Sequence, residues 1–459
     1  MAVTIRRAAA VDFYHFWLMG AVVRAGEAQN VYTPAARIEI GERAYQRAVR
    51  SGAGPALRRA ATKFRRLETT ATPFLYATFF PFVTGHYERD RTVFNALGLL
   101  VFVLALAAVA WRLGYGTTGT LVLVGLVLLV FEPLRSDVRV GNVNRLQFGA
   151  LVLYAWLLWT TTAGDRVRPA LAGGWLGIAA LWKPNLVFVI GTVSFVWWVR
   201  GERARPWSHL AGVAAGALAA AAYAIAFFGT ARVWLWWLQA AARLTHDFPV
   251  PVGEGNFAPT RVLEQGFGVR LGVAWPIALV ALLGLALRRT ASSRRGSAPV
   301  DGEILVLVGI GCAVSLLAAP LAWLHYYLLG VFLVAWVLRP APRGGAVPWP
   351  YRVAGVGAVV ALSMGPLLQL FVPSAPYRWA AFGNGGLLVL LLLGLYDLGR
   401  LEFGPPIRDA SVCPSTNRSS LPTKPGSSSP SATARSTPWP RSPKGRGSTW
   451  PRSAPPSRV

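Results

Sequence analysis

The chain has 459 residues, of which 54% are hydrophobic and only 14% are charged, and its formal net charge is +27. A soluble domain carries about a quarter charged residues, so this chain has too few of them to cover a water-facing surface. A soluble enzyme, a secreted disulfide scaffold and a disordered protein are therefore excluded. The apolar residues come in uncharged runs close to the roughly 20 residues that cross a hydrocarbon core. The composition predicts a polytopic membrane protein.

Hydropathy along the chain predicts an all-α, polytopic transmembrane helical bundle. Each span should be an α-helix, because backbone exposed to lipid must satisfy its hydrogen bonds internally. Residues 72–85 are apolar but short and contain two prolines, which indicates a re-entrant or interfacial segment. The eleven expected spans are 93–111, 117–131, 147–163, 169–182, 184–199, 208–229, 271–288, 304–319, 323–338, 352–372 and 381–399.

Basic residues in the short loops predict the orientation of the spans. They form four groups that lie two spans apart along the chain, as cytoplasmic loops would. The groups are Arg200, Arg203 and Arg205; Arg288, Arg289, Arg294 and Arg295; Arg339, Arg343 and Arg352; and the tail after Arg400. The extracytoplasmic face then holds the segments 12–71, 132–146, 183, 230–270, 320–325 and 373–380. Basic residues between Arg37 and Arg66 conflict with this assignment, but a helix that lies on anionic headgroups would present such a face.

The composition divides the chain into three parts. Residues 1–71 are expected to be an N-terminal extracytoplasmic loop with interfacial helices, and residues 72–399 the transmembrane domain that holds the site. An outer location for Asp12 requires a helix upstream of it, so a first span is expected to be missing. Residues 400–459 are rich in Ser, Pro and Arg and predict a disordered basic tail on the cytoplasmic side.

Charge and motif content exclude several partners and kinds of site. The basic residues suit membrane lipids with anionic headgroups, and no fold that binds nucleic acid fits between spans this closely spaced. The sequence contains no GxxxxGK[ST], HExxH or GxSxG motif. Its five histidines include no pair at ligand spacing, and the two cysteines, Cys312 and Cys413, are isolated, so neither a metal site nor a cofactor is expected.

Polar side chains at the ends of the apolar runs are the candidates for function, because ionisable groups inside a membrane are unfavourable and rarely incidental. By the predicted orientation they gather on the outer face. The candidates are Asp12, His15, Glu88, Asp90, Arg91, Asn142, Asn144, Arg145, Lys183, Asn185, Asn256, Trp323 and His325. Taken one at a time, each also fits a structural task such as a helix cap, a turn, a snorkelling lysine or an aromatic belt.

The order of the motifs along the chain is their most specific feature. They are Asp12-Phe13-Tyr14, Val31-Tyr32, Thr72-Pro73-Phe74, Gly141-Asn142-Val143-Asn144, the run GGWLGIAALWKP that ends at Lys183-Pro184, Asn256-Phe257-Ala258, and Ala319-Pro320-Leu321-Ala322-Trp323-Leu324-His325-Tyr326. With these motifs, roughly residues 12–340 resemble glycosyltransferase family 87, integral-membrane type C enzymes that use polyprenyl-phosphate sugars, often mannose.

This resemblance implies a helical fold with a cavity that opens at the extracytoplasmic face of the plasma (inner) membrane. In the family an acid in the first outer loop is the catalytic base, and Asp12 occupies the matching position. The histidine of the Pro-x-x-Trp-x-His element is expected near the donor phosphate, and here it is His325. Lys183 matches the lysine of the Lys-Pro position.

The residues themselves are suited to the chemistry of sugar transfer. A departing phosphate needs positive charge, which Lys183, His325 and Arg145 are expected to supply. The attacking hydroxyl must lose a proton, which calls for a carboxylate. Further contacts to the substrates are expected from Asn142, Asn144, Asn256 and Trp323.

The expected function is transfer of a hexose, with mannose favoured, from a polyprenyl-phosphate donor to a cell-envelope glycolipid or glycan, with inversion. The alternative from another class is a flippase or transporter of lipid-linked sugars, which needs basic side chains for the lipid phosphate but no base. Inverted repeats would favour transport, and the sequence shows no convincing repeat. A membrane scaffold without activity is the third possibility.

Overall fold

The computed structural model describes residues 8–26, 30–65, 70–159, 161, 165–247, 250–292, 302–341, 347–371 and 376–400. Contacts divide the chain into two units, Met1–Gly404 and Pro405–Val459, and all described residues belong to the first. The expected disordered tail beyond residue 400, the first seven residues and the basic residues Arg294, Arg295 and Arg343 lie outside the described part of the chain.

All regular elements of the described residues are helices, which confirms the predicted all-α class. The α-helices are α2 (Val11–Arg24), α3 (Pro34–Arg50), α4 (Pro55–Phe64), α5 (Pro73–Phe79), α6 (Tyr87–Arg112), α7 (Gly116–Val130), α8 (Glu132–Val140), α9 (Asn144–Trp159), α10 (Val167–Trp182), α11 (Val187–Val199), α12 (Ala204–Phe228), α13 (Arg232–Asp247), α14 (Pro259–Phe267), α15 (Ala274–Ser292), α16 (Glu303–Ala318), α17 (Val331–Val337), α18 (Trp349–Phe371) and α19 (Pro376–Arg400). The 3₁₀ helices are η1 (Phe80–Phe82), η2 (Pro184–Leu186), η3 (Val252–Glu254) and η4 (Leu324–Gly330).

Four described helices are long and apolar enough to cross a membrane: α6, α12, α15 and α19. The pair α7 and α8 adds a fifth candidate if the two helices, which meet at a bend of 60°, count as one broken span. All eleven expected spans overlap helices, but several of these are short. At a rise of 1.5 Å per residue, the 16 residues of α9, α10 or α16 extend about 24 Å, less than the thickness of a hydrocarbon core. A count of eleven therefore stays a prediction.

Helix α16 is the centre of the larger hydrophobic core. Apart from Glu303 and Ser315 it consists of apolar residues, and each of its residues except Ile304 is buried, with α9, α11, α15, α17, α19 and η4 packed around it. The outer helices instead expose large apolar side chains, among them Leu104 on α6, Leu218 on α12 and Leu282 on α15. This pattern of a buried helix inside and apolar side chains outside is that of a multi-pass membrane protein.

Glycines allow α10 and α12 to pack backbone to backbone. A methyl group at Gly212 or Gly216 of α12 would overlap a carbonyl oxygen of α10, and one at Gly173 or Gly177 would overlap a carbonyl oxygen of α12. Such small-xxx-small spacing is typical of helix pairs in membranes. Because Lys183 directly follows α10, this packing fixes the position from which its side chain extends.

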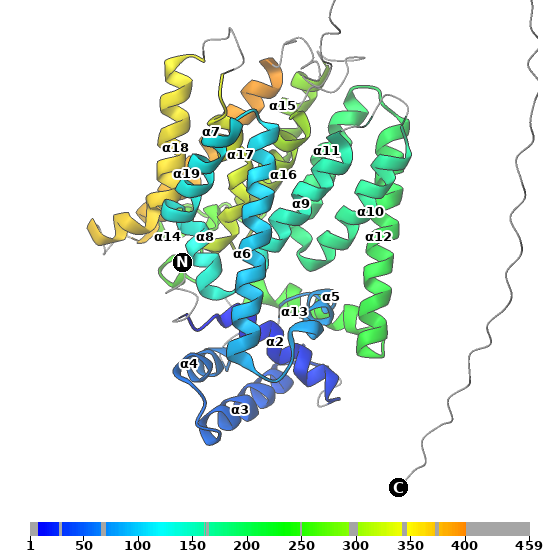
Figure 1. Ribbon diagram of the computed structural model, residues 1–459, viewed down its shortest axis with the longest axis vertical. Coiled ribbons are helices and arrows are strands. Elements are labelled where there is room, and N and C mark those ends of the chain that lie inside the picture. Colours follow the sequence, from blue (N-terminus) through cyan, green and yellow to red (C-terminus); the bar gives the residue numbers. More distant parts are fainter. Residues whose placement is uncertain are drawn as a thin grey trace, which may run out of the picture. The chain divides into compact units, whose positions relative to one another are not determined.

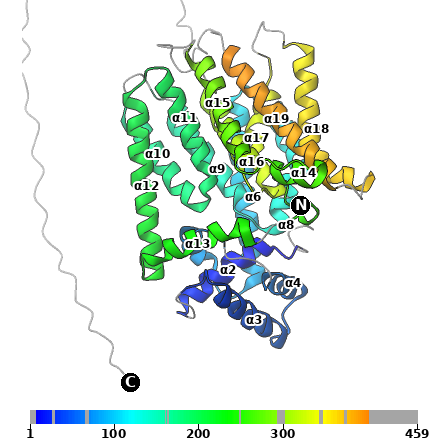
Figure 2. The ribbon, with the colours of Figure 1, turned by 180° about the vertical axis from the view of Figure 1, so that it is seen from behind.

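The helices α2 to α5 form a second hydrophobic core at one end of the long helices, beside α13 (Figures 1 and 2). The ring of Phe13 on α2 lies 6.0 Å from the ring of Phe79 on α5 and 5.1 Å from that of Phe94 on α6. The short apolar segment at residues 72–85 thus forms α5 and η1, which pack against α2 and α12. This arrangement brings the start of α2 to the ends of α8 and α10.

Candidate active site

The turn between α8 and α9 places two asparagines beside the first turn of α2. Helix α8 ends at Gly141, whose φ of 71° is left-handed and whose amide donates to the Asp137 carbonyl oxygen at 2.8 Å. A Cβ atom at Gly141 would lie 2.7 Å from the Cβ of Phe13. Glycine is required here both for the backbone conformation and for the close approach of α2. The approach sets Asp12 next to Asn142.

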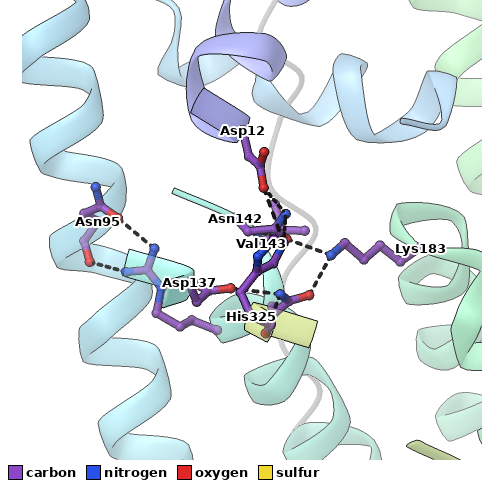
Figure 3. Close-up of polar contacts among 9 residues, drawn as sticks. Asp12, Asn95, Asp137, Asn142, Val143, Lys183 and His325 are labelled. Atoms are coloured by element: carbon purple, nitrogen blue, oxygen red, sulfur yellow. Dashed lines mark hydrogen bonds and ion pairs between the residues drawn. The ribbon is translucent and has the colours of Figure 1, made fainter. Parts of the chain in front are cut away.

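Asn142 joins the three residues that sequence analysis singled out for chemistry (Figure 3). Its Nδ2 donates to Asp12 Oδ2 at 2.6 Å and lies 3.2 Å from His325 Nε2. Its Oδ1 accepts from Lys183 Nζ at 2.7 Å and from the Val143 amide at 2.7 Å. One buried amide therefore connects the carboxylate, the imidazole and the ammonium.

Asn144 holds the same lysine from the start of α9. Its Oδ1 accepts from Lys183 Nζ at 2.6 Å. Its Nδ2 donates to Asp137 Oδ2 at 2.9 Å and to the His325 carbonyl oxygen at 3.0 Å. The two asparagines thus link α8, α9, η4 and the end of α10 through a continuous set of hydrogen bonds.

Lys183 lies in the connection between α10 and α11, and its ammonium is 4.0 Å from the centre of the Tyr326 ring. Burial lowers its pKa to about 8, although the nearby carboxylates of Asp137 and Asp12 favour the charged form. An ammonium group donates three hydrogen bonds. Lys183 makes two such bonds, both to amide oxygens. Its third N–H has no hydrogen-bond partner among the described residues.

Asp12 lies in the first turn of α2, which starts at Val11, so it is not the N-cap of that helix. Burial raises its pKa to about 6, and this effect outweighs the hydrogen bond from Asn142 and the charge of Lys183, both of which lower it. Its side chain is nevertheless 29% exposed, and Oδ2 lies 3.5 Å from His325 Nε2. Among the described residues Oδ1 has no hydrogen-bond partner. Asp12 is therefore a reachable carboxylate whose pKa suits proton transfer near neutral pH.

The sequence profile of glycosyltransferase family 87 matches residues 70–320, more than half of the chain. The chain belongs to glycosyltransferase family 87. It is a membrane glycosyltransferase, as its motifs indicated. No curated protein and no solved structure matches the chain. Within the family 87 match lie Asn142, Asn144, Lys183 and Asn256, whereas Asp12, Trp323 and His325 lie outside it. Asp12 and His325 are joined to the cluster by the contacts described above.

Arg145 of the family 87 enzyme has a different environment from the one expected of a phosphate ligand. It is fully buried, and its guanidinium donates to Asp137 Oδ1 at 2.6 Å and to the carbonyl and side-chain oxygens of Asn95 at 2.9 and 2.7 Å. All three nitrogens are thus bonded within the protein. The contact with the donor phosphate that the sequence predicted for Arg145 stays a prediction, and a phosphate would have to reach a side chain that is fully buried.

Asn256 also lies apart from the cluster and connects main-chain segments of the enzyme. Its Oδ1 accepts from the amides of Ala258 and Ala322 at 3.0 and 3.1 Å, and its Nδ2 donates to the Val250 carbonyl at 3.2 Å. It also forms an isolated antiparallel bridge with Trp323. Its side chain thus fixes the loop that leads into η4, and its predicted contact with a substrate stays a prediction.

Trp323 lies over His325, with the two rings nearly parallel and their centres 6.5 Å apart. Two members of the site were not identified from the sequence. Asp137 is fully buried and binds both Asn144 and Arg145, and Tyr326 lies against Lys183. The position of Asp137 in the sequence could have indicated it as a member of the site, because this acid comes only a few residues before the Gly-Asn-Val-Asn motif.

Proposed function

We propose that the enzyme transfers a hexose, with mannose favoured, from a polyprenyl-phosphate donor to a cell-envelope glycolipid or glycan, with inversion and with Asp12 as the general base. The observation that carries the proposal is the single amide of Asn142, which binds the Asp12 carboxylate at 2.6 Å and the Lys183 ammonium at 2.7 Å. A proton acceptor and a cation for the leaving group thus lie on opposite sides of one small side chain.

The transfer is a single displacement. The oxygen of the acceptor hydroxyl forms a bond to the anomeric carbon, while the bond from that carbon to the phosphate oxygen breaks and its electron pair stays on the phosphate. The hydroxyl proton passes to Asp12 Oδ1, the carboxylate oxygen that has no partner among the described residues. Attack from the face opposite the leaving group inverts the anomeric carbon. General-base catalysis of this kind contributes about 10²–10⁴-fold.

Positive charge beside the phosphate stabilises the developing negative charge on the leaving group. Lys183 supplies it through its remaining N–H. His325 Nε2 lies 3.2 Å from Asn142 Nδ2 and 3.5 Å from Asp12 Oδ2, and it can donate to a phosphate oxygen when it carries a proton. Asn142, Asn144 and Trp323 hold these groups in position, and Arg145 acts only through Asp137.

Apolar side chains next to His325 in the chain suit a lipid donor. They line a small pocket that includes the preceding residue, Leu324. Its other lining residues are Phe257, Tyr327, Ala361, Leu362, Trp379, Ala380 and Gly383. The site would face the extracytoplasmic side of the plasma (inner) membrane, with residues 1–71 beside it and the tail on the cytoplasmic side.

The proposal is tested by incubating the full-length enzyme in lipid nanodiscs with radiolabelled polyprenyl-phosphate mannose and extracted envelope glycolipids. A labelled glycolipid whose anomeric configuration is opposite to that of the donor is expected. Product with retained configuration would contradict the single displacement. In sealed vesicles, movement of the labelled donor across the bilayer without any glycosylated product would instead indicate a flippase.

A further inference from the structure

The Lys183 ammonium is held only by neutral oxygen atoms. Its hydrogen bonds go to Oδ1 of Asn142 and Oδ1 of Asn144, and among the described residues it forms no ion pair. The nearest acids are each one amide further away, because Asp12 binds the Nδ2 of Asn142 and Asp137 binds the Nδ2 of Asn144. Both asparagines therefore lie between a carboxylate and the lysine.

Asp137 determines which way the amide of Asn144 points. An amide presents two N–H donors at one end and an acceptor oxygen at the other. Because the Asn144 Nδ2 binds the carboxylate of Asp137 at 2.9 Å, its Oδ1 is turned to Lys183. Arg145, whose guanidinium also donates to Asn95, binds the other carboxylate oxygen of Asp137, and Asp137 and Arg145 are both fully buried. The negative charge of Asp137 is thus matched by Arg145 and not by Lys183.

Resting on the function proposed above, we infer that Asp137 and Asn144 are positioning residues that hold the Lys183 ammonium through an amide carbonyl instead of a carboxylate, which leaves its charge available to the phosphate of the donor. A carboxylate in direct contact would bind the ammonium as strongly as a phosphate oxygen does, and the incoming donor would have to displace it. A carbonyl oxygen positions the ammonium without neutralising it.

Several charged or titratable groups surround Lys183, and all of them influence its protonation. They are Asp12 on α2, Asp137 on α8, Arg145 on α9, and His325 and Tyr326 on η4. Two are acids and one is the arginine bound to an acid. Burial nevertheless lowers the pKa of Lys183 to about 8, so a change in its direct partner will alter its protonation within an accessible pH range.

The first test needs no substrate. The rate at which Lys183 of the full-length protein reacts with a small acylating reagent is measured against pH by mass spectrometry, because only the neutral amine reacts. The wild-type protein should show a midpoint near 8. Asn144→Asp places a carboxylate on the ammonium and should raise the midpoint by about one pH unit or more. Asn144→Ala removes an acceptor from the charged form and should lower the midpoint.

The matched control is Asn185→Ala. Asn185 follows Lys183 closely in the chain, but its Oδ1 accepts from Gln147 at 3.1 Å and does not contact the ammonium. Its midpoint should equal that of the wild-type protein. Unchanged midpoints in both Asn144 variants, or shifts of the same sign in both, would overturn the inference. A loss of folding would not give opposite shifts in two variants of one residue.

The second test uses the transferase reaction. Asn144→Asp should raise the KM for polyprenyl-phosphate mannose about tenfold or more while the KM for the acceptor stays unchanged, and Asn185→Ala should change neither. Equal changes in both KM values would contradict a role toward the donor phosphate. If the opposite shifts of Lys183 occur but the wild-type enzyme accepts no polyprenyl-phosphate sugar, the inferred arrangement stands and the proposed function fails.

Discussion

The carboxylate of Asp12 and the imidazole of His325 lie 3.5 Å apart, although the two residues are far apart in the chain. Asp12 lies in the first turn of α2, and His325 lies in η4. Asn142 bridges them from a third segment. The site is therefore assembled by tertiary packing and not by any local motif. Each segment contributes one or two polar side chains at the end of a helix.

The rate of transfer should depend on pH in a bell shape. Asp12 accepts a proton only when it is ionised, and burial raises its pKa to about 6, so kcat/KM should rise as the pH increases through about 6. Lys183 binds phosphate only when it is protonated, and burial lowers its pKa to about 8, so kcat/KM should fall as the pH increases through about 8. Initial rates between pH 5 and pH 9.5 measure both limbs.

The alkaline limb has a direct control. In Lys183→Arg the guanidinium stays charged over the whole range, so the variant should be slower than the wild-type enzyme but should lose the alkaline limb and keep the acidic one. An alkaline limb that persists in Lys183→Arg would show that another group titrates there.

Arg145 should matter for stability far more than Arg139. Arg145→Gln leaves Asp137 buried without its ion partner, which costs about 3–5 kcal/mol in the free energy of unfolding. Arg139→Gln removes an ion pair with Glu132 in which the arginine side chain is 57% exposed, and such pairs contribute about 0–1 kcal/mol. Unfolding midpoints of the two variants in one detergent make the comparison. Equal midpoints would contradict the structural role given to Arg145.

The glycine contact between α10 and α12 should be sensitive to one added side chain. In Gly216→Val the new Cβ overlaps the Gly174 carbonyl oxygen, so the helices must separate and the midpoint of thermal unfolding should fall. Overpacking of this kind costs about 1–3 kcal/mol. Gly191→Ala is the control, because no atom lies within 4 Å of its Cβ position. A Gly216→Val protein as stable as Gly191→Ala would mean that the two helices do not pack this closely.

The sequence predicted the helical class and the cluster of Asp12, Asn142, Lys183 and His325, because polar groups that interrupt apolar runs are few and most of them fall at helix ends. It could not predict which arginine of one polar stretch is buried and which is exposed. Arg145 and Arg139 lie in the same polar stretch, and only the three-dimensional packing buries the first against Asp137 and exposes the second. The role of Asp137 was missed for the same reason.

Hydropathy alone could not determine the number of membrane spans either. A run of apolar residues has the same composition whether it crosses the bilayer or ends inside the protein core. Helix α16 shows the difficulty, since nearly all of its residues are apolar, yet it is only 16 residues long and is surrounded by other helices.

The orientation in the membrane should place α3 outside the cell. Arg50 ends α3 at the end of the long helices where α2 to α5 lie, and Arg203 precedes α12, whose start is at the opposite end (Figures 1 and 2). In a Cys413→Ser background, Arg50→Cys should react with an impermeant maleimide in intact cells, while Arg203→Cys should react only after lysis. The reverse pattern would place the site on the cytoplasmic face.

Asp12 is the base of the proposed reaction, and the rate of mannose transfer by Asp12→Asn tests this role most directly. The variant should form labelled product at least about 10²-fold more slowly than the wild-type enzyme, with an unchanged unfolding midpoint. Glu39→Gln, which changes a carboxylate on α3 whose side chain is 68% exposed, should transfer at the wild-type rate. Transfer by Asp12→Asn within about twofold of the Glu39→Gln rate would show that another group accepts the proton.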